Sequence, residues 1–195
     1  QRAVLPRVLS LAQVEQVVKH TPVEIEVFGF GSLCVMVEGR CALSSYATGQ
    51  SPNMNGVCSP ASHVVYDEEG GTLSARLGGF TIHKAAAGEP APYPTLCKGC
   101  FTSRGAGGDR QTGHIFEDPV SLDATTLIPA LKKAGVKALK IEGRQRSRAY
   151  VAEVVRSFRA AVDAAERGQP LPESQLRKLT EGQAATTGAY AKTWR

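Results

Sequence analysis

Apolar and polar side chains alternate strictly over residues 23–28, which read Val-Glu-Ile-Glu-Val-Phe. Successive side chains of a strand point to opposite faces. The pattern therefore predicts a strand with Glu24 and Glu26 on one face and branched apolar residues on the other. Gly29 and Gly31 follow directly and are expected to end this strand.

Other strand signals are short and separated by helical segments. They lie at residues 2–5, 114–117 and 136–142 and in a hairpin formed by residues 72–77 and 80–83. Gly78 and Gly79 stand between the two hairpin strands, where a tight turn needs residues that tolerate positive φ. This hairpin is the one regular element expected in the middle of the chain.

Apolar positions recur at helical spacing in three segments, one beginning at Ser10 and the others at residues 123–133 and 149–166. Ser10 and Gln13 have the spacing of a capping box, which predicts where the first helix starts. Pro129 is expected to start or kink the second helix, and Gly135 to end it.

The recurring order of strand, loop and helix predicts an α/β fold with parallel strands, in a barrel or an open sheet. About four strands and three helices make half of an eightfold barrel, so we expect the C-terminal portion of a TIM-like barrel. The predicted segments are barrel strand-helix-strand (1–31), a cysteine-bearing cluster-binding insertion (32–112), barrel strand-helix-strand-helix (113–168) and a C-terminal tail (169–195). The tail is expected to dock loosely through its few apolar residues, Leu176, Leu179, Tyr190 and Trp194.

The predicted insertion loses regular periodicity and is rich in Gly, Pro, Ser and Asn. It is too long for an ordinary loop, which indicates a functional segment. It contains few core-forming residues, so we expect a metal centre to organise it in place of a hydrophobic core.

Composition adds weaker constraints. The chain has 195 residues, 42% of them hydrophobic, and a formal net charge of +5. This mild basic excess is compatible with an anionic small-molecule substrate, whereas nucleic acid is disfavoured because no run of basic residues is interleaved with aromatics. The sequence shows neither an apolar stretch long enough for a membrane span nor a signal peptide, so we expect a cytoplasmic protein.

The five cysteines are more consistent with reduced thiols than with disulfides, because their number is odd and no export signal is present. Their spacing is Cys34-x6-Cys41-x16-Cys58-x38-Cys97, and Cys100 completes the only tight pair. Structural zinc usually draws its ligands from two tight pairs, so the spacing favours an iron–sulfur cluster over zinc. Unrelated buried cysteines are the alternative. The four histidines follow no metal-ligand spacing.

Charged residues on strand faces form a second group of candidates. Glu24 and Glu26 share a face of one predicted strand, and Lys140 and Glu142 share a face of another, with Arg144 just beyond it. In a parallel barrel these side chains point inward near the edge that carries active sites, and Lys140 is expected to pair with a carboxylate. An antiparallel sheet with one solvated face would show the same alternation. The candidate catalytic residues are Glu26, Lys140, Glu142 and Arg144.

Several motifs resemble the collagenase-like (U32-type) peptidase family. They are Gly31-Ser-Leu-Cys34, residues 38–46, and Lys140-Ile-Glu-Gly-Arg144 followed by Tyr150-Val151. Residues 51–60, 93–99 and 187–194 are similar to the ubiquinone-biosynthesis branch of that family. Two positions depart from the pattern: Cys100 stands where a basic residue is expected, and Phe30 replaces a histidine common in the wider family. The family also begins earlier in the barrel.

This resemblance implies a [4Fe-4S] cluster held by Cys34, Cys41, Cys58 and Cys97 and a heterodimer with a UbiV-like protein. It implies oxygen-independent hydroxylation of the ubiquinone precursor ring. We expect Glu26, Lys140, Glu142 and Arg144 to position an anionic aromatic compound, and an anionic oxygen donor is a further candidate partner. RNA-base hydroxylation, known for relatives of the family, is the alternative. A cluster-stabilised scaffold for a catalytic partner also stays open. Peptidase activity is disfavoured because no Ser/His/Asp or Cys/His nucleophilic constellation is evident.

Overall fold

The structure is a computed structural model that describes residues 1–34, 41–89, 93–144 and 146–191. Contacts divide the chain into two compact units. The first unit combines Gln1–Leu33 with Val120–Arg195, and the second is Cys34–Pro119. Trp194, one of the predicted tail anchors, lies outside the described residues. No helix in the described ranges has the length and apolar character needed to cross a lipid bilayer.

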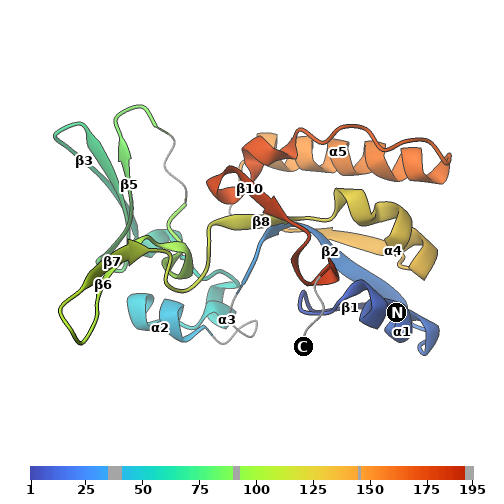
Figure 1. The fold of residues 1–195 in the computed structure, drawn as a ribbon, viewed down its shortest axis with the longest axis horizontal. Helices are drawn as coiled ribbons and strands as arrows, with labels where there is room; N and C mark the ends of the chain where they lie inside the picture. The colour runs from blue at the N-terminus through green and yellow to red at the C-terminus, as the bar shows by residue number, and fades with distance from the viewer. Residues whose placement is uncertain (35–40, 90–92, 145, 192–195) are drawn as a thin grey trace. The chain divides into compact units, whose positions relative to one another are not determined.

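A five-stranded sheet forms the centre of the first unit (Figure 1). Its strands are β1 (Arg2–Val4), β2 (Glu24–Ser32), β8 (Val120–Asp123), β9 (Ala138–Ile141) and β10 (Ala184–Thr186). β2 pairs in parallel with β1 and β9 and antiparallel with β8, and β10 runs parallel to β8. This unit is therefore α/β with a mixed sheet, and its membership of a TIM-like barrel stays a prediction.

The helices of the first unit are α1 (Leu11–Lys19), α4 (Ile128–Ala134) and α5 (Arg148–Glu166). The predicted capping box of Ser10 and Gln13 is confirmed at the start of α1. Gly135 ends α4 in the left-handed conformation, as predicted, with φ of 92°. Pro129 lies in the first turn of α4, where a missing N–H costs no helical hydrogen bond.

Two apolar clusters fill this unit. One joins α1 and α4 to β2 and contains Val14, Ile25, Val27 and Leu131 among its buried residues. The other joins β2 to α5 and contains Phe30, Tyr150, Val154 and Phe158. The helices thus bury their apolar stripes against the apolar residues of one central strand.

The prediction that Gly29 and Gly31 end the strand at residues 23–28 is wrong. β2 continues to Ser32, and its register with β9 shifts between Phe28 and Phe30, so Gly29 is the extra residue of a β-bulge. A Cβ atom at Gly29 would lie 3.0 Å from the Phe158 ring. The missing side chain at Gly29 therefore lets α5 pack closely against β2.

The strand predicted at residues 114–117 is also wrong, because these residues lie between the strands Arg110–Gly113 and Val120–Asp123 and form no strand themselves. Residues 114–117 belong to the second unit instead. The His114 ring Nδ1 donates to the carbonyl oxygen of Lys98 at 3.0 Å, and the Glu117 N–H donates to the Cys97 carbonyl at 3.1 Å. These two hydrogen bonds satisfy carbonyl oxygens in the turn that carries Cys97.

The tail is part of the fold. Leu176 is completely buried in the cluster beneath α5, and β10 adds a strand to the sheet. The Tyr190 hydroxyl donates to the carbonyl oxygen of Phe28 at 2.8 Å. Residues 169–191 therefore dock through backbone pairing and a buried hydrogen bond as well as through apolar side chains.

The second unit contains a three-stranded antiparallel sheet and a two-stranded ribbon (Figure 1). The sheet consists of β3 (Val64–Glu69), β4 (Thr72–Leu77) and β5 (Phe80–Ala86), and the ribbon of β6 (Phe101–Arg104) and β7 (Arg110–Gly113). The helical elements are α2 (Ala42–Thr48), α3 (Pro52–Asn55) and the 3-10 turns η1 (Ala61–His63) and η2 (Leu96–Lys98). The predicted hairpin around Gly78 and Gly79 is confirmed as β4 and β5.

This unit has a small apolar cluster of its own, contrary to the expectation that a metal centre replaces a core. Its buried residues are Ala47, Leu77, Ile82 and Leu96, contributed by α2, β4, β5 and η2. Apolar packing therefore already joins the hairpin to the helix and turn that carry cysteines.

We predict that Gly78→Ala destabilises the second unit far more than Gly70→Ala. Both glycines lie in hairpin turns at nearly the same φ, +54° and +57°. A Cβ at Gly78 would lie 1.6 Å from the Ala47 carbonyl oxygen, whereas one at Gly70 meets nothing within 4 Å. We expect about 1 kcal/mol for the left-handed conformation in both variants and about 2 kcal/mol or more in addition for Gly78→Ala. Urea unfolding followed by circular dichroism measures the difference, and equal losses would show that the turn does not pack on α2.

Candidate functional site

Helix α2 positions two of the candidate cysteines. Cys41 is its N-cap residue, and the Cys41 sulfur accepts a hydrogen bond from the Ser44 N–H at 3.3 Å. The Ser44 hydroxyl donates to the carbonyl oxygen of Cys58 at 2.6 Å. One turn of this helix therefore fixes Cys41 directly and the backbone of Cys58 through a buried serine.

Cys97 lies in η2, between the buried residues Leu96 and Lys98. Leu96 belongs to the apolar cluster of the second unit, and the Cys97 carbonyl accepts the hydrogen bond from the Glu117 N–H. Cys97 is itself buried, whereas Cys41 and Cys58 are half-buried and Cys34 and Cys100 are exposed.

The electrostatic neighbours of Cys97 show which cysteines the fold gathers. Burial raises the pKa of the Cys97 thiol to about 12, and the charges of Cys58, Cys34 and Cys41 also raise it, while the Lys98 ammonium lowers it. Burial likewise raises the pKa of Cys58, with Cys34 and Cys41 adding to the rise. Cys100 is not among the groups that shift either pKa. The four cysteines proposed from the sequence thus lie within electrostatic reach of one another.

The chemistry of this set fits a centre with four thiolate ligands, as iron–sulfur clusters require. Among the described residues, no three His, Cys, Asp or Glu side chains are spaced closely enough to bind one metal ion. Collecting the four sulfur atoms therefore requires side-chain rotation or local movement of the backbone. The raised pKa values mean that a metal must also displace protons from Cys58 and Cys97.

A second group of polar side chains lies in the first unit, where β2 and β9 end. The Glu142 carboxylate accepts a hydrogen bond from the Ser32 N–H at 3.3 Å. Its Oε2 atom is 3.9 Å from the Arg146 guanidinium. That guanidinium stacks over the Tyr150 ring at 5.2 Å. Burial raises the pKa of Tyr150 to about 12, so its hydroxyl stays protonated at neutral pH.

Glu181 from the tail completes this group, which we call the Glu142 cluster: Ser32, Ser121, Glu142, Arg146 and Glu181. The Glu181 carboxylate accepts hydrogen bonds from Arg146 at 3.0 Å and from the Ser32 hydroxyl at 3.1 Å. The Glu181 N–H donates to the Ser121 hydroxyl at 2.9 Å. The sequence did not indicate Ser32, Ser121, Arg146 or Glu181, because the contacts join residues as many as 149 positions apart.

Gly31 makes room for Glu142. A Cβ atom at Gly31 would lie 2.4 Å from the Cβ of Glu142, and the φ of Gly31 is +132°. Only glycine is compatible with both the backbone conformation and this approach. Gly31 of the Gly31-Ser-Leu-Cys34 motif thus leaves the space that the Glu142 side chain occupies.

The other candidate charges lie elsewhere. The Glu26 carboxylate forms an ion pair with Arg2 at 3.7 Å. The Lys140 ammonium stands 5.9 Å from the centre of the Phe28 ring, and the predicted ion pair of Lys140 with a carboxylate is not formed within the described part of the chain. Arg144 is exposed in the loop after β9. Of the four catalytic candidates, only Glu142 belongs to the Glu142 cluster.

Phe30, which replaces a family histidine, is a core residue here. It is 1% exposed, and its ring packs against Tyr150 and Phe158 with centroid separations of 6.1 and 6.0 Å.

Comparison with known proteins identifies the class. The sequence matches Peptidase family U32 over residues 1–193, and the chain belongs to this family. It is 35% identical to tRNA hydroxylation protein P of Escherichia coli K12, over 91% of this chain and 42% of that protein. It is 29% identical to the 23S rRNA 5-hydroxycytidine C2501 synthase of the same organism, over 84% of this chain and 19% of that protein. A collagenase of Porphyromonas gingivalis is 28% identical over 75% of this chain and 31% of the collagenase.

The chain thus spans less than half the length of these relatives. No solved structure matches it.

These relatives confirm the resemblance to the U32 family and correct the expected function. The prediction of a role in ubiquinone biosynthesis is contradicted by relatives named for hydroxylation of tRNA and rRNA. The comparisons do not show the likeness to the ubiquinone-biosynthesis branch of the family. RNA-base hydroxylation, the alternative reading of the sequence, agrees with them better. The iron–sulfur cluster, the UbiV-like partner and the anionic oxygen donor stay predictions.

The thiols themselves offer a test in metal-free protein. With a pKa of about 12 in place of the usual 9.0, Cys97 has a thiolate fraction roughly a thousandfold smaller at pH 8 than an ordinary thiol. We expect iodoacetamide to label exposed Cys100 first and Cys97 last. The Cys97 rate should keep rising with pH beyond 9.0, because its thiol ionises only as the pH approaches 12. Peptide mass spectrometry measures each rate, and rapid labelling of Cys97 at pH 8 would contradict the buried environment.

Proposed function

We propose that this chain forms the iron–sulfur part of an enzyme that hydroxylates RNA bases. The observation that carries the proposal is its likeness, over 91% of its length, to tRNA hydroxylation protein P. The gathering of Cys34, Cys41, Cys58 and Cys97 in one neighbourhood supports it, because hydroxylation is an oxidation and four cysteine thiolates are the usual ligands of an iron–sulfur redox centre.

Hydroxylation of a base replaces a C–H hydrogen with a hydroxyl group and removes two electrons from the base. The reaction therefore needs an oxygen source and an electron acceptor. A [4Fe-4S] cluster bound by the four cysteines would supply electron transfer. The protein's own contribution is to hold the thiolates, with Cys97 shielded from water by the apolar cluster around Leu96.

The Glu142 cluster is the proposed site of proton transfer and substrate positioning. Functional groups in parallel α/β units lie at the carboxyl ends of the strands, and Glu142 directly follows β9 at this end. Arg146 and the Ser32 N–H hold one oxygen of Glu142 and so fix its orientation. Glu142 would accept the proton released from the base carbon, and exposed Arg144 would bind an anionic oxygen donor, for which a guanidinium is well suited.

Iron analysis tests the ligand set. In full-length protein purified without oxygen, we expect Cys→Ala at position 34, 41, 58 or 97 to remove most iron and acid-labile sulfide. Cys100→Ala is the matched control and should keep both, because this exposed thiol does not influence the Cys58 or Cys97 pKa. Loss of iron only in Cys100→Ala, or zinc in place of iron and sulfide, would contradict the assignment.

Nucleoside analysis tests the reaction. This protein would be expressed at full length in an Escherichia coli strain that lacks its own tRNA hydroxylation protein P. Mass spectrometry of digested tRNA and rRNA would then detect nucleosides with one added oxygen atom. We expect the wild type to restore such a nucleoside and Glu142→Gln to lower its yield about 100-fold. Glu26→Gln is the control, because Glu26 pairs with Arg2 outside the Glu142 cluster, and its yield should change less than about twofold. If the wild type left every nucleoside unchanged, the proposed function would be wrong.

A further inference from the structure

The ribbon of β6 and β7 has two chemically different faces. The register pairs Phe101 with Gly113, Thr102 with Thr112, Ser103 with Gln111 and Arg104 with Arg110. Because side chains alternate along a strand, the Phe101 and Ser103 pairs share one face and the threonine and arginine pairs share the other. The first face is the inner one, since Phe101 packs against the apolar cluster of the second unit and against the Phe116 ring at 6.0 Å.

The outer face consists of Thr102, Arg104, Arg110 and Thr112, and all four are exposed. The two threonine hydroxyls are 2.9 Å apart and hydrogen-bonded. Arg104 and Arg110 stand directly opposite each other, next to the ribbon's glycine-rich turn. The face therefore presents two guanidinium groups and two hydroxyls, and no apolar side chain.

This arrangement opposes the stability of the free protein. Like charges directly across an antiparallel pair repel, and a two-stranded ribbon is only marginally stable. Within the described residues, neither Arg104 nor Arg110 forms an ion pair with a carboxylate. Arg76 of β4, in the same unit, differs because it pairs with Asp67 at 3.4 Å. A bound anion would turn the repulsion of Arg104 and Arg110 into joint attraction.

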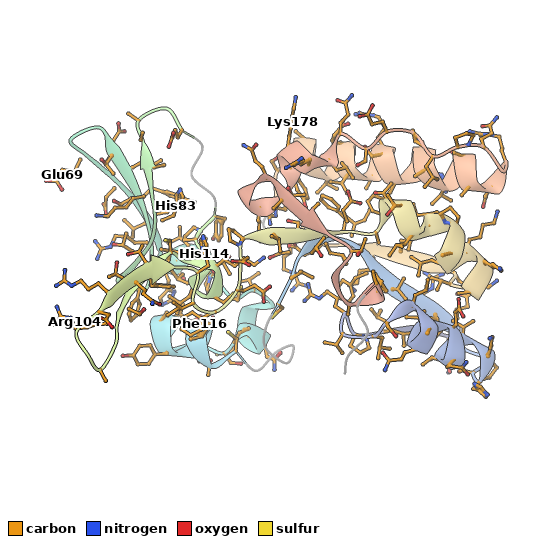
Figure 2. All side chains as sticks on the ribbon, in the orientation of Figure 1. Glu69, His83, Arg104, His114, Phe116 and Lys178 are labelled. Carbon is orange, nitrogen blue, oxygen red and sulfur yellow. The ribbon has the colours of Figure 1, made fainter. Side chains whose placement is uncertain are left out.

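The ribbon is joined to the candidate cluster site. Phe101 follows Cys97 by four residues, and the segment after β7 returns to the same turn through His114 and Glu117. Figure 2 shows Arg104 far along the ribbon from His114. Arg104 lies three positions after Phe101 along the strand, a span of roughly 10 Å. The arginines thus lie at one end of a ribbon whose other end adjoins the turn that carries Cys97.

We propose that the outer face of this ribbon binds the phosphate backbone of the RNA substrate. The inference rests on the proposed function, which supplies RNA as the polyanion. Guanidinium and hydroxyl groups are the usual donors to phosphate oxygens, and such contacts position nucleic acid without reading its sequence. The absence of aromatic side chains from these four positions agrees with backbone contact and not with base stacking.

Salt-dependent binding of the full-length protein to unmodified tRNA tests this proposal. We expect Arg104→Ala/Arg110→Ala to weaken binding roughly tenfold near physiological salt and to reduce the slope of log affinity against log salt by roughly two. The double Arg→Lys variant should keep most of the slope, because it keeps the charge. Arg76→Ala is the matched control, and its affinity should equal that of the wild type. The double Ala variant should melt at or above the wild-type temperature, because the repulsion is gone.

The outcomes separate this inference from the proposed function. Wild-type affinity and slope in the double Ala variant, alongside normal RNA hydroxylation by the wild type, would overturn the inference and leave the function standing. Loss of tRNA affinity in that variant, with no hydroxylation by the wild type, would support RNA binding by the ribbon and refute the proposed hydroxylation of RNA bases. Arginine-dependent binding of polyglutamate, with tRNA binding unaffected or undetectable, would overturn the inference in favour of an acidic protein partner.

Discussion

β2 approaches its neighbours closely at two glycines, where an added Cβ atom would be crowded at Gly29 and would overlap another atom at Gly31. At Gly29 a side chain would press on the Phe158 ring of α5, and at Gly31 it would overlap the Cβ of Glu142. The first approach lets α5 cover the bulge and bury Phe30, and the second brings Glu142 to the backbone of Ser32. The apolar core and the Glu142 cluster of the first unit therefore depend on the same two missing side chains.

The tail depends on this arrangement as well. Glu181 reaches Arg146 and Ser32 only because β10 extends the sheet and Leu176 is buried beneath α5. A carboxyl group with 12% exposure needs such partners, because burying a polar or charged group without a partner is costly. A segment that is polar in composition is thereby fixed by a few specific contacts.

In the second unit, α2 has a comparable role. It caps its own start with Cys41, holds Cys58 through Ser44, and places the Ala47 carbonyl against the turn at Gly78. A cluster of four buried apolar residues is small for a unit of this length, so a bound metal would add stability to an existing framework. Metal binding and proton release would be coupled, since Cys58 and Cys97 favour the protonated thiol when no metal is bound.

The sequence by itself determined what depends on near neighbours along the chain. Strand alternation, the capping box at Ser10, the C-cap at Gly135 and the hairpin at Gly78 and Gly79 are local signals, and the structure contains each of them. The U32 family was also evident from motifs. The assignment of four cysteines as cluster ligands stays a prediction.

Tertiary structure alone decided the rest. It showed that Gly29 and Gly31 permit close approach, that Glu181 completes the Glu142 cluster, and that Lys140 stands over an aromatic ring. It also brought together Arg104 and Arg110, which a search for basic runs overlooks because five residues separate them. These contacts are set by strand register and by the packing of distant segments, which no local pattern encodes.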